Sequence, residues 1–122
     1  MFCALLASAA TATAQQTAHR YAFVDADCKA GFSGIPGEGA KRIVSGIMDL
    51  ELTPASLITA ETDLGTQFRA EVDRKYPGSL NQFNGVYVYL FNDPEAARKR
   101  RDEMISNYRS AEITLLEFPV KP

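Results

Sequence analysis

Residues 86–95 read VYVYLFNDPE and combine the pattern of a strand with that of a helix start. Val86–Phe91 is an uncharged run of β-branched, aromatic and aliphatic residues, which predicts a strand that lies centrally in a sheet and is covered on both faces. The following residues predict the start of a helix, because Asp93 can cap the first turn and Pro94 fits the first helical position. A strand joined directly to a helix indicates a domain in which helices pack against a sheet.

The chain downstream continues this pattern. The helix is expected to run to about Tyr108, and residues 112–118, EITLLEF, predict a last strand that Pro119 ends. The apolar positions that we expect to face inward on this helix are Ala97, Met104, Ile105 and Tyr108.

A second helix is predicted upstream of the strand. Apolar side chains recur there at helical spacing and share one face: Leu57, Leu64, Phe68, Val72 and Tyr76. We expect a helix over residues 62–75 with Thr62 or Asp63 as the N-cap, and the pattern leaves open whether it reaches back to Pro54. Gly65 costs about 1 kcal/mol relative to alanine in a helix, which indicates a close packing contact there.

Two further strands are predicted before that helix. In residues 19–25, aromatic Tyr21 and Phe23 alternate with Ala22 and Val24, which is strand periodicity. Residues 41–52, KRIVSGIMDLEL, fit a helix or a strand, and the adjacent β-branched residues and internal glycine favour a strand.

The loop between these strands contains GIPGEGAKR, residues 34–42. Gly34 and Gly39 have the spacing of a phosphate-binding loop, but Ala40 separates Gly39 from Lys41, and Arg42 stands where a hydroxyl residue is needed. We therefore expect this loop only to join two strands of a hairpin, without binding a nucleotide.

Together these elements predict an α+β domain in the order β-β-α-β-α-β. We expect a two-layer sandwich, with a four-stranded sheet and two helices on one face. If the strands on either side of the last helix are parallel, their crossover should be right-handed.

Residues 1–16, MFCALLASAATATAQQ, predict export. They carry no charge, residues 2–10 form a short apolar core, and Ala12-Thr13-Ala14 fits the pattern that signal peptidase reads. We expect a signal peptide over residues 1–14 and a single periplasmic or secreted domain over residues 15–122. A buried N-terminal helix is the alternative.

Cleavage would leave Cys28 as the only cysteine of the mature chain. A single cysteine in an oxidising compartment cannot form an internal disulfide. We expect Cys28 to be buried and inert, and a disulfide between two chains is the alternative.

The bulk composition excludes several classes of protein. Hydrophobic residues make up 46% and charged residues 23% of the 122 residues, which indicates a folded globular chain. The formal net charge of −2 argues against a nucleic-acid partner. No apolar run approaches the roughly 18 residues that a membrane-spanning helix needs.

No catalytic or metal-binding constellation stands out. Asp25 and Asp27 should share one strand face, but a metal site needs three or four converging ligands, and we interpret the pair as a charged exit into a loop. His19 and Cys28 form the one nucleophile–base pairing on offer, so an envelope enzyme or redox protein that uses them is the alternative function. We expect no catalytic residue, cofactor or metal.

Residues 98–101, RKRR, are the only basic cluster. From Asp93 to Glu103, four basic residues stand among four acidic ones, and opposite charges recur four positions apart. We interpret this segment as a solvated helix face whose charges pair with one another.

The feature most suggestive of binding is aromatic. Alternation places the rings of each strand on one side, and the candidate binding residues are Tyr21, Phe23, Tyr87, Tyr89 and Phe91. If the helices cover the aliphatic side, the rings form an exposed patch of the kind that marks a partner surface. If the helices cover the rings, the rings form the main core instead.

Two resemblances extend this interpretation. Phe68, Val72 and Tyr76 on a helix, followed by a strand and then by Phe91-Asn92-Asp93, Ala97 and Arg101-Asp102, make residues 68–102 similar to small exported bacterial proteins of unknown function. Residues 86–105 resemble half of a sporulation-related repeat, which is a peptidoglycan-binding domain. These resemblances imply an envelope location and, for the second, a cell-wall glycan partner.

The sequence therefore predicts a small exported domain that acts by binding. The partners that fit are another protein, a second copy of the chain held through a sheet face, or cell-wall glycan.

Overall fold

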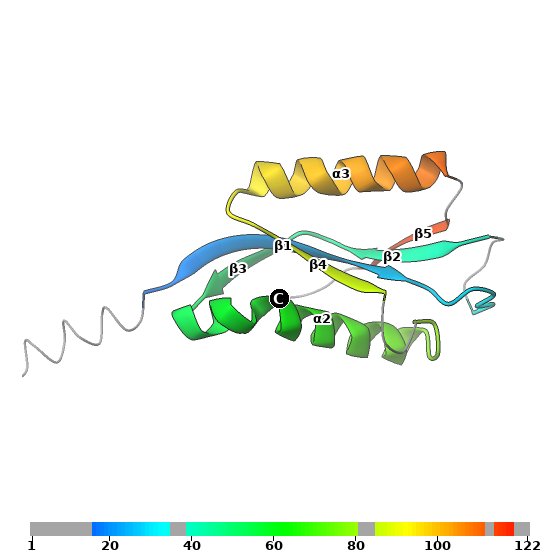
Figure 1. Ribbon diagram of the computed structural model, residues 1–122, viewed down its shortest axis with the longest axis horizontal. Helices are drawn as coiled ribbons and strands as arrows, with labels where there is room; N and C mark the ends of the chain where they lie inside the picture. Colours follow the sequence, from blue (N-terminus) through cyan, green and yellow to red (C-terminus); the bar gives the residue numbers. More distant parts are fainter. Residues whose placement is uncertain (1–15, 35–38, 81–84, 112–113, 119–122) are drawn as a thin grey trace, which may run out of the picture.

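The structure is a computed structural model that describes residues 16–34, 39–80, 85–111 and 114–118. The chain forms a sheet and two helices (Figure 1). The elements are β1 (Ala18–Asp27), β2 (Lys41–Ser45), β3 (Met48–Leu52), α2 (Pro54–Lys75), β4 (Val86–Phe91), α3 (Pro94–Ser110) and β5 (Thr114–Phe118). The α+β class and the general order of strands and helices are as predicted, but segment 41–52 forms two strands instead of one, so the sheet has five strands and not four. The predicted signal peptide lies outside the described residues.

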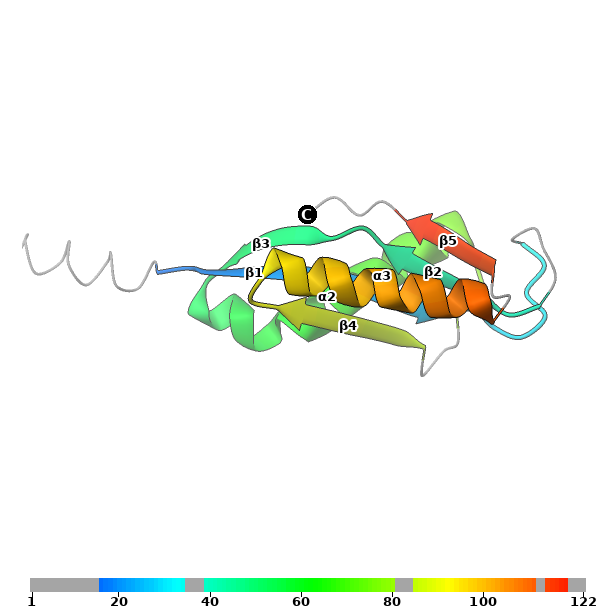
Figure 2. The ribbon, with the colours of Figure 1, turned by 90° about the horizontal axis from the view of Figure 1, so that it is seen from above.

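Strand β1 is the centre of the sheet. It pairs antiparallel with β4 on one side, and with β2 and β3 on the other, and β5 extends the sheet by pairing parallel with β2. Seen from above, β4 and β5 lie at opposite edges (Figure 2). The ambiguous segment 41–52 is thus extended, as favoured, and its hairpin partner is β1.

A bulge divides that segment into β2 and β3. Because Asp25 pairs with Val44 and Ala22 pairs with Met48, only residues 23–24 of β1 face residues 45–47 of the other strand. The buried Ser45 hydroxyl accepts a hydrogen bond from the Val24 amide at 2.8 Å and so satisfies a donor that the bulge removes from the ladder.

The two helices lie on opposite faces of the sheet, so the expectation of both helices on one face is wrong (Figure 1). Strands β3, β4 and β5 all run antiparallel to β1 in direction and therefore parallel to one another. The β3–α2–β4 crossover moves towards the β4 edge, whereas β4–α3–β5 returns to the other edge. Two crossovers of the same hand that move in opposite directions must place their helices on opposite faces.

The position predicted for Val86–Phe91 also needs correction. Within the described chain β4 pairs with β1 alone, so it is an edge strand and not a central one. Its two apolar faces have another cause: α2 contacts one side of β4 and α3 contacts the other.

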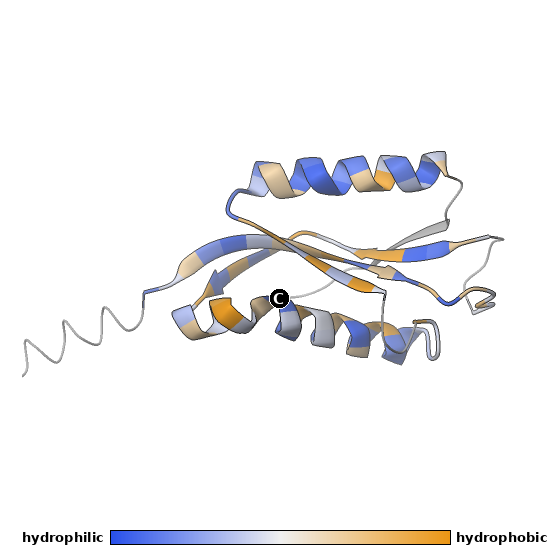
Figure 3. Cartoon of the chain, in the orientation of Figure 1, coloured by the Kyte–Doolittle hydropathy of each residue, from blue (hydrophilic) through white to orange (hydrophobic). Residues whose placement is uncertain are grey.

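Each face of the sheet carries its own core. The larger core joins the sheet to α2 and is built from aliphatic residues with one aromatic ring: Ala22, Val24, Ala26, Ile43, Met48, Phe68, Val72 and Leu80. The smaller core joins the sheet to α3 and consists of Phe23, Val44 and Met104. Hydropathy follows this division, since α3 is hydrophilic along much of its length while the strands beneath it are more hydrophobic (Figure 3).

The helix boundaries agree with sequence for α3 and differ for α2. Asp93 caps α3 by accepting a hydrogen bond from the Glu95 amide, as predicted. Helix α2 starts at Pro54, and its N-cap is Thr53 rather than Thr62 or Asp63, because Thr53 and Ser56 form a reciprocal capping box. Neither described helix has the length and apolar character needed to cross a membrane.

Candidate functional site

The five aromatic residues singled out in the sequence come together on one face of the sheet. Pairing of β1 with β4 sets Tyr21 opposite Phe91 and Phe23 opposite Tyr89, and it places Tyr87 at the end of the same row, opposite Asp25. We call Tyr21, Phe23, Tyr87, Tyr89 and Phe91 the aromatic row. The row lies on the α3 side, because Phe23 packs with Met104 of α3.

Helix α3 covers only part of the aromatic row. Phe23 is fully buried, and its ring stacks on Tyr89 at 4.9 Å and on Phe91 at 6.0 Å between centroids. The rings of β4 lie nearer the edge: Tyr89 and Phe91 are half-buried, and Tyr87 is 46% exposed. Of the two rings on β1 only Phe23 is core, because Tyr21 is partly exposed and stacks on the His19 ring at 5.7 Å between centroids. The row therefore runs from a buried ring to an exposed one, which combines the two alternatives that the sequence left open.

Among the described residues, the backbone of β4 is paired on one side only, and we call its other side free. The Asp27 amide donates to the Gly85 carbonyl at 2.6 Å, so these two residues form a hydrogen-bonded pair. Such pairs alternate along an antiparallel ladder, and Tyr87, Tyr89 and Phe91 therefore direct their amide and carbonyl groups towards β1. The intervening residues direct theirs outwards.

Those outward residues are Val86, Val88 and Leu90. They share the aliphatic side of β4, which packs with the α2 core without becoming fully buried. The free edge thus offers backbone hydrogen-bonding groups at every second residue, flanked by aliphatic side chains on one face and rings on the other. We call this free side of β4, together with Tyr87, Tyr89 and Phe91, the edge surface.

Gly85 fixes the entry to this strand. Its backbone has φ +102°, a conformation that side-chain-bearing residues seldom adopt. A β-carbon there would also lie 3.3 Å from both the β-carbon and the carbonyl oxygen of Asp27. Glycine therefore permits the close approach of β4 to the end of β1.

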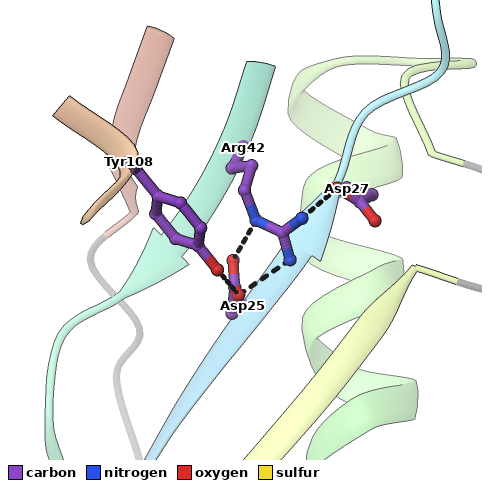
Figure 4. A network of polar contacts seen from close by, with 4 residues as sticks. All are labelled: Asp25, Asp27, Arg42 and Tyr108. Atoms are coloured by element: carbon purple, nitrogen blue, oxygen red, sulfur yellow. Dashed lines mark hydrogen bonds and ion pairs between the residues drawn. The ribbon is translucent and has the colours of Figure 1, made fainter. Parts of the chain in front are cut away.

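A polar network surrounds Asp25, which pairs with Tyr87 at the exposed end of the aromatic row. Figure 4 shows its four members, Asp25, Asp27, Arg42 and Tyr108. Asp25 is fully buried and receives hydrogen bonds from Arg42 Nε at 3.1 Å and Nη2 at 2.8 Å. The Tyr108 hydroxyl of α3 also donates to Asp25, while Arg42 Nη1 binds Asp27. The Arg42 side chain is 14% exposed, so β1, β2 and α3 meet at a largely desolvated ion pair.

The network shapes the protonation of its members. Burial alone would lower the pKa of Arg42, but the hydrogen bond and charge of Asp25 outweigh it and raise that pKa. Burial, followed by the hydrogen bond to Asp25, raises the pKa of the Tyr108 hydroxyl. Burial and then the charge of Asp25 also raise the pKa of Tyr89. All three shifts favour the forms that these groups ordinarily have at neutral pH, a charged Arg42 and neutral Tyr89 and Tyr108.

Arg42 links the network to the edge surface. Its guanidinium carbon lies 4.8 Å from the centroid of the Tyr108 ring and 5.9 Å from that of Tyr87. Both distances fall within the range of cation–π attraction. The exposed Tyr87 ring is consequently held against a cation that is itself fixed by two carboxylates.

The interpretation of Asp25 and Asp27 as a charged exit into a loop was wrong for Asp25, which is fully buried. Alternation correctly placed Asp25 and Asp27 on one face, but only Asp27 is substantially exposed, at 41% of its side chain. The available signal was the apolar run around Asp25 together with Arg42 on the facing strand of the expected hairpin. The partner on α3 could not be inferred, because Tyr108 is 83 residues away in sequence.

The alternative nucleophile–base pair does not assemble. His19 lies near the start of β1, where its ring pairs with Asp49 at 2.6 Å, whereas Cys28 follows the end of β1. Nine residues of extended chain separate them by about 30 Å. In the described residues no group of three or more histidine, cysteine or acidic side chains could hold a metal ion.

Cys28 was predicted to be buried and inert, but it is only partly buried. It is half-buried, and burial, then the charge of Asp27, raises its pKa above the ordinary value. It borders an open hollow of about 520 Å³ that is also lined by Phe32 and Lys41, whose ammonium donates to the Phe32 carbonyl at 3.2 Å.

Three of the four side chains of the basic cluster have partners on α3 or at the bulge. Arg98 pairs with Glu95 at 2.7 Å and Arg100 with Glu103 at 3.8 Å, both three positions apart rather than four. Arg101 instead donates to the Ser45 carbonyl at 2.8 Å and ties α3 to the bulge.

Comparison with known proteins gives no match: no protein-family model, no curated protein and no solved structure is significantly similar to this chain. The two resemblances drawn from the sequence therefore stay predictions.

Proposed function

We propose that this chain is a small exported domain that acts by binding a protein partner at the edge surface, without catalysis. The observation that carries the proposal is the free edge of β4, an uncharged six-residue strand with apolar side chains on both faces and outward-pointing backbone groups. Export is supported by the uncharged residues 1–16, their short apolar core at residues 2–10 and the Ala12-Thr13-Ala14 pattern.

An edge of this kind favours strand addition. Domains that remain alone in solution usually protect an exposed edge with charged residues, proline or a bulge. Val86–Phe91 contains none of these. A partner strand would gain main-chain hydrogen bonds from the outward residues and apolar contacts from both faces, which is how several peptide-binding domains recognise extended segments.

The polar network supports binding rather than bond-making. Arg42 is paired with two carboxylates and Tyr108 is held neutral, so the described network presents no activated nucleophile or base. Its effect is to fix α3 over the sheet and to position the Tyr87 ring. Rigid rings beside a free edge lower the entropy lost when a partner docks.

Site-specific photocrosslinking tests the proposal. p-Benzoylphenylalanine replaces Tyr87 in the mature chain, and the labelled protein is irradiated in an extract of the cell envelope. The matched control carries the same group in place of Ile58, which is 86% exposed on α2, on the opposite face of the sheet. We expect a discrete protein adduct from position 87 and none from position 58.

The absence of an adduct at position 87, or equal adducts at both positions, would overturn the proposal. A parallel arm sediments the chain with insoluble cell-wall glycan. If the native chain and Ile58→Ser sediment with the glycan and Tyr87→Ser does not, the partner at the edge surface is glycan and not a protein.

A further inference from the structure

We infer that the partner at the edge surface is a second copy of this chain, which joins the two sheets through antiparallel pairing of β4 with β4. This inference rests on the proposed function and names its partner. It follows from three properties of β4: the positions of its outward groups, the chemistry of its two faces and the charge around it.

The outward groups are self-complementary. An antiparallel ladder forms its hydrogen-bonded pairs between outward-pointing residues of the two strands. A two-fold axis at Val88 sets Val88 opposite Val88 of the second copy and Val86 opposite Leu90 of the second copy, so all three outward residues of β4 are paired in this register. Each copy then uses the same patch, as an isologous interface requires.

The two faces are self-complementary as well. A two-fold axis perpendicular to the sheet leaves both α2 helices on one side and both α3 helices on the other. Aliphatic residues of β4 then meet aliphatic residues, and Tyr87 lies opposite Tyr89 of the second copy. An incoming strand must be apolar on both faces to fit, a pattern typical of strands covered on both sides, and this chain supplies one.

Charge does not oppose the association. Helix α3, which flanks the aromatic side of β4, carries five basic residues and, with its cap Asp93, four acidic ones, so its net charge is small. The opposite edge of the sheet is less suited to pairing, because β5 contains Glu117 and is followed by Pro119.

The decisive experiment compares Val88→Pro with Val88→Ala by analytical ultracentrifugation over a range of concentrations. The Val88 amide points away from β1, so proline removes a hydrogen-bond donor at the new interface and leaves the β1–β4 ladder intact. Alanine shortens the same side chain and keeps the amide. We expect a dimer for the native chain and Val88→Ala, and at least about 30-fold weaker association for Val88→Pro, since symmetry removes two bonds.

Residue-resolved amide exchange of the unmodified chain gives a test that needs no variant to fold. The amides of Val86, Val88 and Leu90 should become protected as the concentration rises through the dimerisation range. The amides of Tyr87 and Tyr89 should be protected at every concentration, because they bond to β1.

A native chain that stays monomeric, or a dimer that Val88→Pro leaves intact with no change in exchange at the outward amides, would overturn the inference. The two proposals fail separately in the photocrosslinking experiment. An adduct with the mass of two chains supports both, an adduct with a different protein retains the proposed function and rejects the second copy, and no adduct rejects both.

Discussion

The α2 face and the α3 face belong to one sheet but are stabilised by different interactions. Towards α2, β1 presents Ala22, Val24 and Ala26, all fully buried in an apolar core. Towards α3, the alternate residues of the same strand are Phe23 and Asp25, which meet one methionine and a hydrogen-bonded charge network. The α2 face is stabilised mainly by burial of apolar surface, and the α3 face by a small number of charge-assisted hydrogen bonds with defined geometry.

This difference explains where the edge surface lies. Apolar contacts are non-directional, whereas the hydrogen bond from Tyr108 to Asp25 needs a particular distance and angle between α3 and β1. The network and the contact of Arg101 with the bulge therefore hold α3 in place over β1. The rings of β4 remain only partly covered.

The largest effect should come from the α2 face. Phe68 is 1% exposed, and Phe68→Ala leaves a cavity in the larger core, so we expect a loss of about 3–5 kcal/mol in the free energy of unfolding. Urea unfolding followed by circular dichroism measures it. The control is Ile58→Ala on the same helix, where the side chain is exposed and the change should stay within about 0.5 kcal/mol. Equal losses at both positions would contradict the assignment of this face to burial.

The next largest loss in the free energy of unfolding should come from Asp25→Asn on the α3 face. The substitution leaves Arg42 largely desolvated without its buried counter-charge, at a cost of about 3 kcal/mol. We place the cost at the lower end for buried pairs because Arg42 keeps Asp27. Asp27→Asn is the matched control. Because the Asp27 carboxylate is partly exposed, its loss should lower the free energy of unfolding by less than about 1 kcal/mol. If the control costs as much as Asp25→Asn, the network is not centred on the buried carboxylate.

Tyr108→Phe tests the same face through pH. It removes the hydrogen bond to Asp25 and should cost about 1.5 kcal/mol near neutral pH. Because the folded protein raises the pKa of Tyr108, the unfolded chain loses this proton above about pH 10 while the folded chain keeps it, so the stabilisation falls as pH rises. Urea unfolding at pH 8 to 11 should show the gap between native and variant proteins narrowing at the alkaline end. The other tyrosines are common to both proteins, and a constant gap would contradict the role of Tyr108.

Local patterns in the sequence predicted the elements well. The cap at Asp93, the buried face of α3 with Met104 and Ile105, and the shared face of Phe68 and Val72 all follow from short-range periodicity. The grouping of the aromatic row followed from strand alternation once β1 and β4 were recognised.

Arrangement in three dimensions was harder to predict. The placement of α2 and α3 on opposite faces depends on which strands pair and in which direction, and β4 is apolar on both faces although it lies at an edge. The burial of Asp25 depends on contacts with Arg42 and Tyr108, which are distant in sequence. Such long-range pairings leave no periodic signal in a single chain.

The smallest expected change in the free energy of unfolding comes from Gly65→Ala, which tests how tightly α2 is packed against β4. The cost of Gly65 within a helix indicated a close contact, and α2 does approach β4 there: a β-carbon would lie 3.5 Å from Val88 Cγ2 and 3.9 Å from Val86 Cγ1. These are ordinary van der Waals distances, so Gly65→Ala should fit and raise the free energy of unfolding by about 0.5–1 kcal/mol through reduced entropy of the unfolded chain. Urea unfolding at a fixed protein concentration measures the gain. A loss would show that α2 and β4 are packed as specifically as the network on the other face, and the contrast between the two faces would no longer hold.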